Sequence, residues 1–291
     1  MSKQRIISWW SGGIASAVAC QLALEEFSDD FDVEVVFIDT KNEHEDTYRF
    51  LKDCESIYGK EIKVISSSRW ESIEQVWRTR LSLNVAGGAV CSSELKKNVR
   101  IKYQDIEKDF AQIFGFDYDT NEQKRARNML KNFPEINPFF PLIEKKYTKQ
   151  KCISVVKSWG VDIPKMYELG FRNNNCFKTG CVQGGMGYWK KIQKEFPEKY
   201  DQMANLEHEL SEAKGQPVTI CYDEIGGKAR IRRKLFLKHN PKMPDVLDIS
   251  IKKGGKVEPL TECNGFCSTD EQIDLFGEII SDIQRIRNAE F

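Results

Sequence analysis

The first 65 residues alternate between short apolar runs and segments of helical spacing, and this alternation restricts the fold more than any other feature. Residues 5–10, 33–38 and 62–65 are rich in Ile, Val, Phe and Trp, as buried strands are. Between them, residues 15–26 and 45–58 place apolar side chains at helical spacing. Such an alternation predicts an α/β fold with a doubly wound parallel sheet and helices on both of its faces.

Beyond residue 70 the sequence is more polar, and its pattern changes near residue 216. Helical spacing predicts helices over 71–84, 92–112, 121–132 and 148–159, and one or two more over 188–213. From 216 onward β-type runs predominate, at 218–222, 228–238 and 246–251, before an amphipathic helix over 270–288. We therefore predict a large α/β domain over 1–214 and a smaller C-terminal α+β part over 215–291.

Composition excludes several classes of protein. The 291 residues include 44 Lys and Arg against 44 Asp and Glu, so the formal net charge is zero. A globally basic nucleic-acid-binding protein is thereby excluded, although a local basic face is not. No stretch approaches the ~18 apolar residues of a membrane span, and the first residues lack the apolar core of a signal peptide. We expect a cytoplasmic protein without membrane contact.

The strongest chemical signal is Ser-Gly-Gly-Ile-Ala-Ser, from Ser11 to Ser16, between the first strand and the first helix. Gly12 and Gly13 allow a tight turn that brings backbone N–H groups near an anion, while the helix beginning at Ile14 directs its positive end there. The hydroxyls of Ser11 and Ser16 add hydrogen bonds to phosphate oxygens. An ordinary strand-to-helix turn has the same composition, but a place at the carboxyl edge of a parallel sheet favours a ligand. The spacing excludes both the Walker loop and the dinucleotide fingerprint.

This segment resembles the PP-loop of the ATP pyrophosphatase superfamily, and residues 3–185 are similar to the phosphoadenosine phosphosulfate (PAPS) reductase family. The similarity includes Asp39-Thr40 at the end of the second strand, the segment 43–48 after it, and Cys91 with the lysines that follow. The resemblance implies that ATP and Mg²⁺ bind here. It places the phosphates on Ser11, Gly12, Gly13, Ile14 and Ser16, and the adenine near Phe37, Asp39 and Thr40.

Two departures from the family pattern bear on activity. The superfamily pattern is Ser-Gly-Gly-x-Asp-Ser, whereas this chain has Ala15 at the Asp position. Reductases of the family end in a Glu-Cys-Gly-Leu/Ile-His tail with a nucleophilic thiol, but here the last four residues are Asn-Ala-Glu-Phe. The segment Glu262-Cys263-Asn264-Gly265 weakly resembles that tail. Sulfonucleotide reduction is therefore weakened as a prediction.

Nine cysteines require an explanation, and an odd number in a chain without a secretory signal argues against a disulfide framework. Four of them are predicted to be buried thiols, namely Cys20, Cys54, Cys152 and Cys221. The remaining five are Cys91, the pair Cys176 and Cys181, and the pair Cys263 and Cys267. These five are the candidate metal ligands.

Two close cysteine pairs in loops rich in Gly and Asn can bring four thiolates together, as Zn²⁺ or an iron–sulfur cluster requires. The pairs have four and three intervening residues, looser spacings than Cys-x-x-Cys, so incidental buried thiols are the alternative. The resemblance to adenylylsulfate reductases groups Cys91, Cys176 and Cys181, joined by Cys263 or Cys267. It also favours a [4Fe–4S] cluster over Zn²⁺.

Two cationic features suggest what else binds. Residues 226–234 hold five positive charges, which could follow a nucleic-acid backbone or simply form a solvated hairpin face. Arg172 resembles the arginine of a Gly-x-Arg segment that approaches nucleotide phosphates in PAPS reductase-like proteins. A surface arginine beside a glycine turn is the alternative.

Together these features predict an enzyme, an ATP pyrophosphatase that adenylates an acceptor and releases AMP and pyrophosphate, with Ser11, Ser16 and Arg172 as its catalytic residues. By family analogy the reaction is coupled to sulfur transfer to a nucleic acid, DNA or tRNA, from a sulfur donor protein. One alternative is a PAPS or adenylylsulfate reductase with Cys263 or Cys267 as nucleophile; another is a non-catalytic ATP-binding subunit, which Ala15 favours. An exposed Ile stripe on 270–288 would favour a homodimer, and packing on its own domain is the other outcome.

Overall fold

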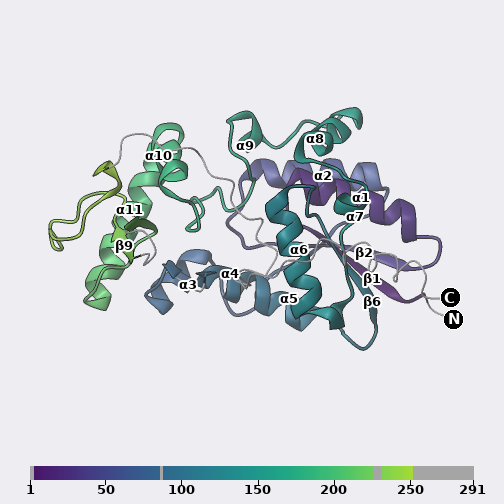
Figure 1. The fold of residues 1–291 in the computed structure, drawn as a ribbon, viewed down its shortest axis with the longest axis horizontal. Coiled ribbons are helices and arrows are strands. Elements are labelled where there is room, and N and C mark those ends of the chain that lie inside the picture. The colour runs from purple at the N-terminus through teal and green to yellow at the C-terminus, as the bar shows by residue number, and fades with distance from the viewer. Residues whose placement is uncertain (1–2, 86–87, 226–230, 252–291) are drawn as a thin grey trace.

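A computed structural model describes residues 3–85, 88–225 and 231–251, and its centre is a five-stranded parallel sheet (Figure 1). The strands lie in the order β3-β2-β1-β6-β7. Their bounds are β1 (Arg5–Trp10), β2 (Asp32–Ile38), β3 (Lys63–Ile65), β6 (Asp109–Phe114) and β7 (Pro138–Phe139). Since the order grows outward from β1 in both directions, the sheet is doubly wound, and the predicted α/β class is confirmed.

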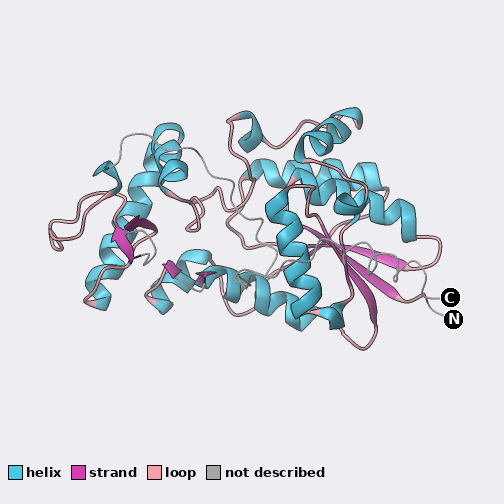
Figure 2. Ribbon diagram, in the orientation of Figure 1, coloured by secondary structure: helices cyan, strands magenta, loops and turns pink. Residues whose placement is uncertain are grey.

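Helices cover both faces of this sheet (Figure 2). Consecutive strand residues point to opposite faces, so neighbouring apolar residues of one strand pack against different helices. Trp10 packs with α1 (Ile14–Phe27), α2 (Glu45–Tyr58) and α8 (Lys149–Ser158) on one face. Its neighbour Trp9 packs on the other face, with α5 (Asn98–Tyr103) and α6 (Thr120–Asn132). Both faces of β1 are therefore core, as its continuous apolar run predicted.

The remaining elements are short, apart from two helices at the far end of the molecule. They are α3 (Ile73–Arg80), β4 (Asn84–Val85), β5 (Gly88–Ala89), α4 (Val90–Ser92), the π-helical turn η1 (Ser93–Lys97), the 3₁₀ turn η2 (Pro134–Ile136), α7 (Pro141–Glu144), α9 (Lys165–Glu168), α10 (Met186–Glu195), α11 (Pro197–Lys214), β8 (Cys221–Ile225), β9 (Ile231–Leu235) and the 3₁₀ turn η3 (Ile249–Ile251).

Two predicted elements differ from the structure. The helix predicted over 92–112 is confirmed only in its first part: helical structure runs without a break through α4, η1 and α5 and ends at Tyr103, and the segment that follows contributes β6, which pairs with β1 in the middle of the sheet. Gln112 made this strand hard to recognise in the sequence, because its polar amide is buried and has a distant hydrogen-bond partner. The Trp9 indole N–H donates to it at 2.9 Å. The β run expected over 246–251 is instead η3, with one isolated bridge from Phe236 to Asp248.

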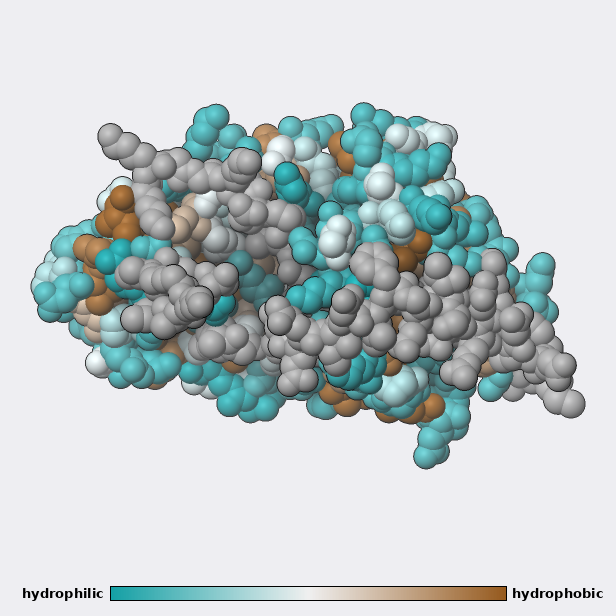
Figure 3. Space-filling model, in the orientation of Figure 1, coloured by the Kyte–Doolittle hydropathy of each residue, from teal (hydrophilic) through white to brown (hydrophobic). Residues whose placement is uncertain are grey.

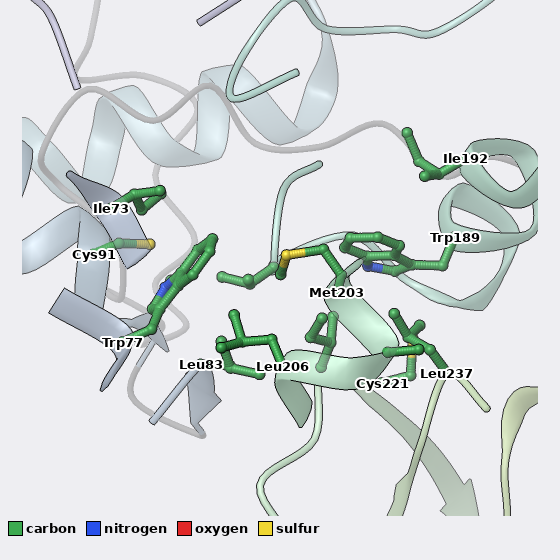
Figure 4. Close-up of a cluster of buried hydrophobic side chains, with 14 of the residues drawn as sticks. Ile73, Trp77, Leu83, Cys91, Trp189, Ile192, Met203, Leu206, Cys221 and Leu237 are labelled. Carbon is green, nitrogen blue, oxygen red and sulfur yellow. The ribbon is translucent and has the colours of Figure 1, made fainter. Parts of the chain in front are cut away.

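A second hydrophobic core lies beyond the carboxyl edge of the sheet (Figure 4). Trp77 of α3 and Cys91 of α4 meet a cluster that includes Trp189 of α10, Met203 of α11 and Leu237 beyond β9. The cluster thus joins residues from both sides of the predicted boundary at 214/215, and the division into 1–214 and 215–291 stays a prediction. The predicted helix over 270–288 lies outside the described residues.

Hydrophilic side chains predominate over the described part of the face in Figure 3, and hydrophobic ones form small patches among them. Within residues 3–85, 88–225 and 231–251, no helix is both long and apolar enough to cross a membrane.

Candidate functional site

Four segments of the chain meet at the carboxyl edge of the sheet. Ser11 follows β1, Asp39 follows β2, Ser66 follows β3 and Gly115 follows β6. The Asp39 amide donates to the Ile65 carbonyl at 2.8 Å, so the ends of β2 and β3 are held together. Ligands of open α/β sheets bind at this edge where the strand order reverses, which here is beside β1.

Ser16 organises residues 11–16, referred to below as the 11–16 loop. Its hydroxyl oxygen accepts from both the amide and the hydroxyl of Ser11 at 2.9 Å, and it donates to the Gly13 carbonyl at 2.9 Å. Gly13 precedes α1 with extended backbone and no side chain to cap the helix, while the Ile14 amide donates to the Tyr167 hydroxyl at 3.4 Å. The positive end of α1 therefore faces the edge where a ligand would lie.

Two close contacts fix the position of this loop. Gly12 has φ +86°, and a Cβ added there would lie 2.9 Å from the Thr47 Cγ2 on α2. On the other side, a Cβ on Gly115 would lie 2.4 Å from the Cα of Ser16. Glycine is required at both positions, at the first also because its backbone is left-handed.

The segment that carries Cys176 and Cys181, residues 173–181, lies directly against the 11–16 loop and is called the 173–181 loop. Asn174 makes the link: its Nδ2 donates to the Gly12 carbonyl at 3.0 Å and to the Thr47 hydroxyl at 3.0 Å. The sequence analysis did not predict this contact, which the structure makes through a direct hydrogen bond.

A second set of bonds ties the 173–181 loop to the turn after β2. Glu43 is buried; one carboxylate oxygen accepts from the Thr40 hydroxyl and the other from the Cys176 amide, both at 2.9 Å. Asn42 adds three more: its Nδ2 donates to the Thr179 hydroxyl at 2.8 Å and to the Cys176 carbonyl at 3.4 Å, and its backbone carbonyl accepts from the Lys178 amide at 3.0 Å.

Cys91, Cys176 and Cys181 line one small cavity of about 20 Å³, which also borders Thr40 and the buried Lys96. The structure therefore brings together three of the five predicted metal ligands, while Cys263 and Cys267 lie outside the described residues. Cys20, Cys54, Cys152 and Cys221 are buried, as predicted.

The surroundings of Cys176 favour the protonated form of its thiol. The hydrogen bond with Cys181 raises the pKa of the Cys176 thiol well above its ordinary value; burial and the nearby Glu43 carboxylate raise it further. The Lys96 ammonium acts in the opposite direction on the same pKa. A soft metal would displace the proton and stabilise the thiolate.

The donor set fits a metal in chemistry, though not as a preformed cage. Soft thiols suit Zn²⁺ and iron–sulfur clusters alike. In the part of the chain that the structure describes, no group of three or more His, Cys, Asp or Glu side chains has the arrangement of a metal site. The three cysteines are therefore neighbours of one cavity whose thiols must move closer to share an ion.

Two larger cavities open near the carboxyl edge of the sheet. One, of about 420 Å³, opens at the end of β3, where Ser66, Ser67 and Ser68 face Asn98 and Lys102. The other, of about 610 Å³, lies beyond β6. Its lining residues include Gly115, Asp117, Arg125, Lys149, Tyr167 and Arg172.

The predicted nucleotide residues occupy different positions around this edge. Asp39 and Thr40 follow the end of β2; Asp39 accepts from the Tyr48 hydroxyl at 3.0 Å, and Thr40 borders the cysteine cavity. Phe37 is fully buried and packs edge-to-face on Trp10, so a nucleotide would meet the chain at Asp39 and Thr40. Arg172 is exposed and lines the cavity beyond β6.

Sequence reasoning missed Glu43, Tyr167 and Asn174. The run Asn173-Asn174-Asn175 carried the available signal: it pointed to a loop, and all three amides are buried. Buried amides need hydrogen-bond partners, which makes such a run a candidate for binding another loop.

Fold and site together define a doubly wound α/β protein with a loop of Ser and Gly at the switch point of its sheet, where ligands of such folds bind. The sequence matches the phosphoadenosine phosphosulfate reductase domain family over residues 5–183. The chain belongs to this family, as the motifs around Ser11 and Asp39 indicated.

Three individual proteins illustrate what the chain is similar to. The uncharacterized protein MJ0066 of Methanocaldococcus jannaschii is 28% identical over 213 residues, 72% of this chain and 43% of that protein, so the chain spans less than half of its relative's length. A PAPS reductase from Candida auris in complex with phosphate is 12% identical, with a TM-score of 0.44 over 59% of this chain and 81% of the other. The U34-tRNA thiolase NcsA from Methanococcus maripaludis, with its [4Fe-4S] cluster, is 14% identical, with a TM-score of 0.40 over 87% and 84%.

Proposed function

We propose that the protein is an ATP pyrophosphatase that adenylates an acceptor and couples this step to sulfur transfer at the cysteine cavity. One observation supports the proposal: Asn174 joins the Gly12 carbonyl to the Cys176 segment, so the 11–16 loop is in direct contact with the segment that lines the thiol cavity. Chemistry at a phosphate can thus be followed by chemistry at a sulfur without a long transfer.

In this proposal ATP lies along the carboxyl edge of the sheet. Its triphosphate occupies the 11–16 loop, where backbone N–H groups, the serine hydroxyls and the positive end of α1 converge. Its adenosine extends past Asp39 toward the cavity of about 420 Å³ at the end of β3. The α-phosphate then lies near Thr40, which also borders the cysteine cavity.

The chain acts on this phosphate mainly by position and charge. An acceptor oxygen attacks the α-phosphorus, the bond to the bridging oxygen breaks, and pyrophosphate leaves with the electron pair. Arg172 neutralises the charge that develops on the leaving group, and Ser11 and Ser16 orient its oxygens. Mg²⁺, when bound to the phosphates, reduces their charge further.

The cysteines serve the second half of the proposed reaction. Cys91, Cys176 and Cys181, with Cys263 or Cys267, would hold a [4Fe–4S] cluster or Zn²⁺, which supplies a sulfur-binding metal site when bound. Lys96 provides positive charge beside the thiolates. A nucleic acid, DNA or tRNA, is the proposed acceptor, and a separate protein is the proposed sulfur donor.

Two measurements test the proposal. Titration calorimetry with Mg·ATP should show binding that Ser16→Ala weakens by about tenfold, the effect of losing about 1.4 kcal/mol. Ser154→Ala is the matched control, because that hydroxyl bonds only within α8. Protein purified without oxygen should contain iron with equal acid-labile sulfide, or zinc without it, and Cys176→Ser should lose the metal whereas Cys20→Ser keeps it. Absence of both ATP binding and metal would refute the proposal.

Sulfonucleotide reduction is the second candidate, favoured by the description of the matching family. It requires a thiolate of Cys263 or Cys267 to attack the sulfur of PAPS or adenylylsulfate, so that the S–O bond breaks and the nucleotide phosphate leaves with the electron pair. A thiol reductant then attacks the S-sulfocysteine at its cysteine sulfur, forms a disulfide and releases sulfite. Sulfite that forms with a reductant and disappears in Cys263→Ser would favour this reaction. ATP binding without turnover would instead favour a non-catalytic subunit, consistent with the buried methyl of Ala15 where the superfamily has a carboxylate.

A further inference from the structure

Asn174 occupies the junction between the two halves of the site. Its side chain is 1% exposed, and its Nδ2 donates two bonds of 3.0 Å, to the Gly12 carbonyl and to the Thr47 hydroxyl. Its Oδ1 is buried without a hydrogen-bond partner among the described residues. A buried acceptor without a partner is unfavourable, so the oxygen gives no reason for an asparagine at this position. The two hydrogen bonds that its Nδ2 donates give that reason.

Two residues further on, the backbone of Cys176 is in a conformation that depends on its anchors. Its φ is +59°, in the left-handed region that residues other than glycine seldom adopt. Such a conformation persists where the surrounding structure determines it. Here the anchors are Glu43, bonded to the Cys176 amide, and Asn174, bonded to the 11–16 loop.

We propose that Asn174 is a positioning residue that couples anion binding at the 11–16 loop to the conformation of the 173–181 loop. The coupling passes through a single peptide group. The Gly12 carbonyl, which accepts from Asn174, and the Gly13 N–H belong to the same rigid peptide plane and point in opposite directions.

An anion that accepts from the Gly13 N–H polarises this peptide and strengthens the bond that its carbonyl accepts from Asn174. Binding of polyphosphate therefore tightens the 173–181 loop, and by reciprocity an ordered 173–181 loop favours polyphosphate binding. This inference rests on the proposed function, because it requires polyphosphate at the 11–16 loop.

Hydrogen exchange measured by mass spectrometry tests the coupling, with inorganic pyrophosphate as the probe. The Cys176, Lys178 and Gly180 amides all donate hydrogen bonds within or from the 173–181 loop. Saturating pyrophosphate should slow exchange of peptides covering this loop by about fivefold or more, the lower end of typical coupling between sites. Exchange in β8 and β9 should not change.

Variants assign the effect to Asn174. Asn174→Leu removes both donated bonds while it keeps the number and branching of the side-chain heavy atoms, and it should abolish the slowing, although pyrophosphate still binds at higher concentration. Asn175→Leu is the matched control, since Asn175 is an adjacent buried amide that makes no side-chain hydrogen bond to the 11–16 loop, and it should keep the slowing. Thr47→Val removes one acceptor, leaves the Gly12 bond intact and should also keep it. If Asn174→Leu does not fold, Asn174→Asp serves instead, because a carboxylate cannot donate to the Gly12 carbonyl.

The outcomes separate this inference from the function on which it rests. Wild-type protein that binds no pyrophosphate by calorimetry would overturn both. Binding with unchanged exchange of the 173–181 loop would overturn the coupling alone. Equal loss of the slowing in the Asn174 and Asn175 variants would also overturn it, because the effect would then belong to loop packing in general.

Discussion

Replacing Gly115 by alanine tests how closely the turn after β6 and the first turn of α1 must pack. The added Cβ would lie 2.4 Å from the Cα of Ser16 and 2.6 Å from its amide nitrogen, whereas ordinary contact begins at 3.4 Å. About 1 Å of separation is therefore needed, and both opposing atoms belong to backbone, so no side-chain rotation relieves the overlap. We expect a loss of about 3 kcal/mol in the free energy of unfolding, at the upper end of overpacking costs.

For a chain of this size a loss of that order lowers the thermal midpoint by about 6–12 °C. Displacing Ser16 also disturbs the hydroxyl that closes the 11–16 loop, so affinity for pyrophosphate should fall by about tenfold or more. Calorimetry and thermal unfolding measure the two effects. Gly185→Ala is the control, because nothing lies within 4 Å of its added Cβ. A Gly115→Ala protein as stable and as strongly binding as this control would refute the packing argument.

Three further predictions follow from individual contacts. Gly12→Ala should destabilise the protein more than Gly215→Ala, because both glycines have left-handed backbone but only the Cβ added at Gly12 meets a close neighbour, Thr47 Cγ2 at 2.9 Å. Thr47→Ser removes this methyl group and should recover part of the lost thermal midpoint of Gly12→Ala; no recovery would contradict the contact. Burial raises the pKa of Glu207 to about 8, so its proton is bound more tightly in the folded state than in the unfolded state. The free energy of unfolding should therefore fall by about 1 kcal/mol per pH unit as the pH rises from the pKa of the unfolded state to pH 8. Glu207→Gln should flatten this decline, and identical pH dependence of the two proteins in thermal melts from pH 5.5 to 8.5 would argue against it. Arg172 is exposed and forms no ion pair within the described residues, so Arg172→Ala should change the thermal midpoint little. The same variant should weaken ATP binding about tenfold, whereas Lys157→Ala should change neither property. Unaltered ATP affinity in Arg172→Ala would remove this residue from the site.

The first half of the sheet was predictable because its signals are local. Residues 5–10 and 33–38 correspond to β1 and β2, and α2 spans the predicted 45–58, beginning where the His44 side chain accepts from the Asp46 amide and ending at the left-handed Gly59. Strand β6 was not predictable in this way. Gln112 is polar in the sequence but buried in the strand, where its Oε1 accepts from the Trp9 indole, 103 residues away, and its Nε2 donates to Gln104 Oε1 at 3.0 Å.

The site divides along the same line. The 11–16 loop and the cysteine pair could be recognised from residue type and spacing within a few positions. The bonds that make one site of them could not, since Asn174 and Gly12 are 162 residues apart and Cys176 and Glu43 are 133 apart. Such pairs become visible only once the sheet order brings the ends of β1 and β2 together.

In the proposed reaction, ATP is cleaved between its α- and β-phosphates at the 11–16 loop. The most direct measurement is the fate of ATP labelled at the α-phosphate, incubated with the metal-loaded protein and bulk tRNA or DNA and separated by thin-layer chromatography. We expect label in AMP or in an adenylated acceptor, with an equal amount of pyrophosphate, and loss of both in Ser16→Ala. Label in ADP, with release of inorganic phosphate, would contradict it.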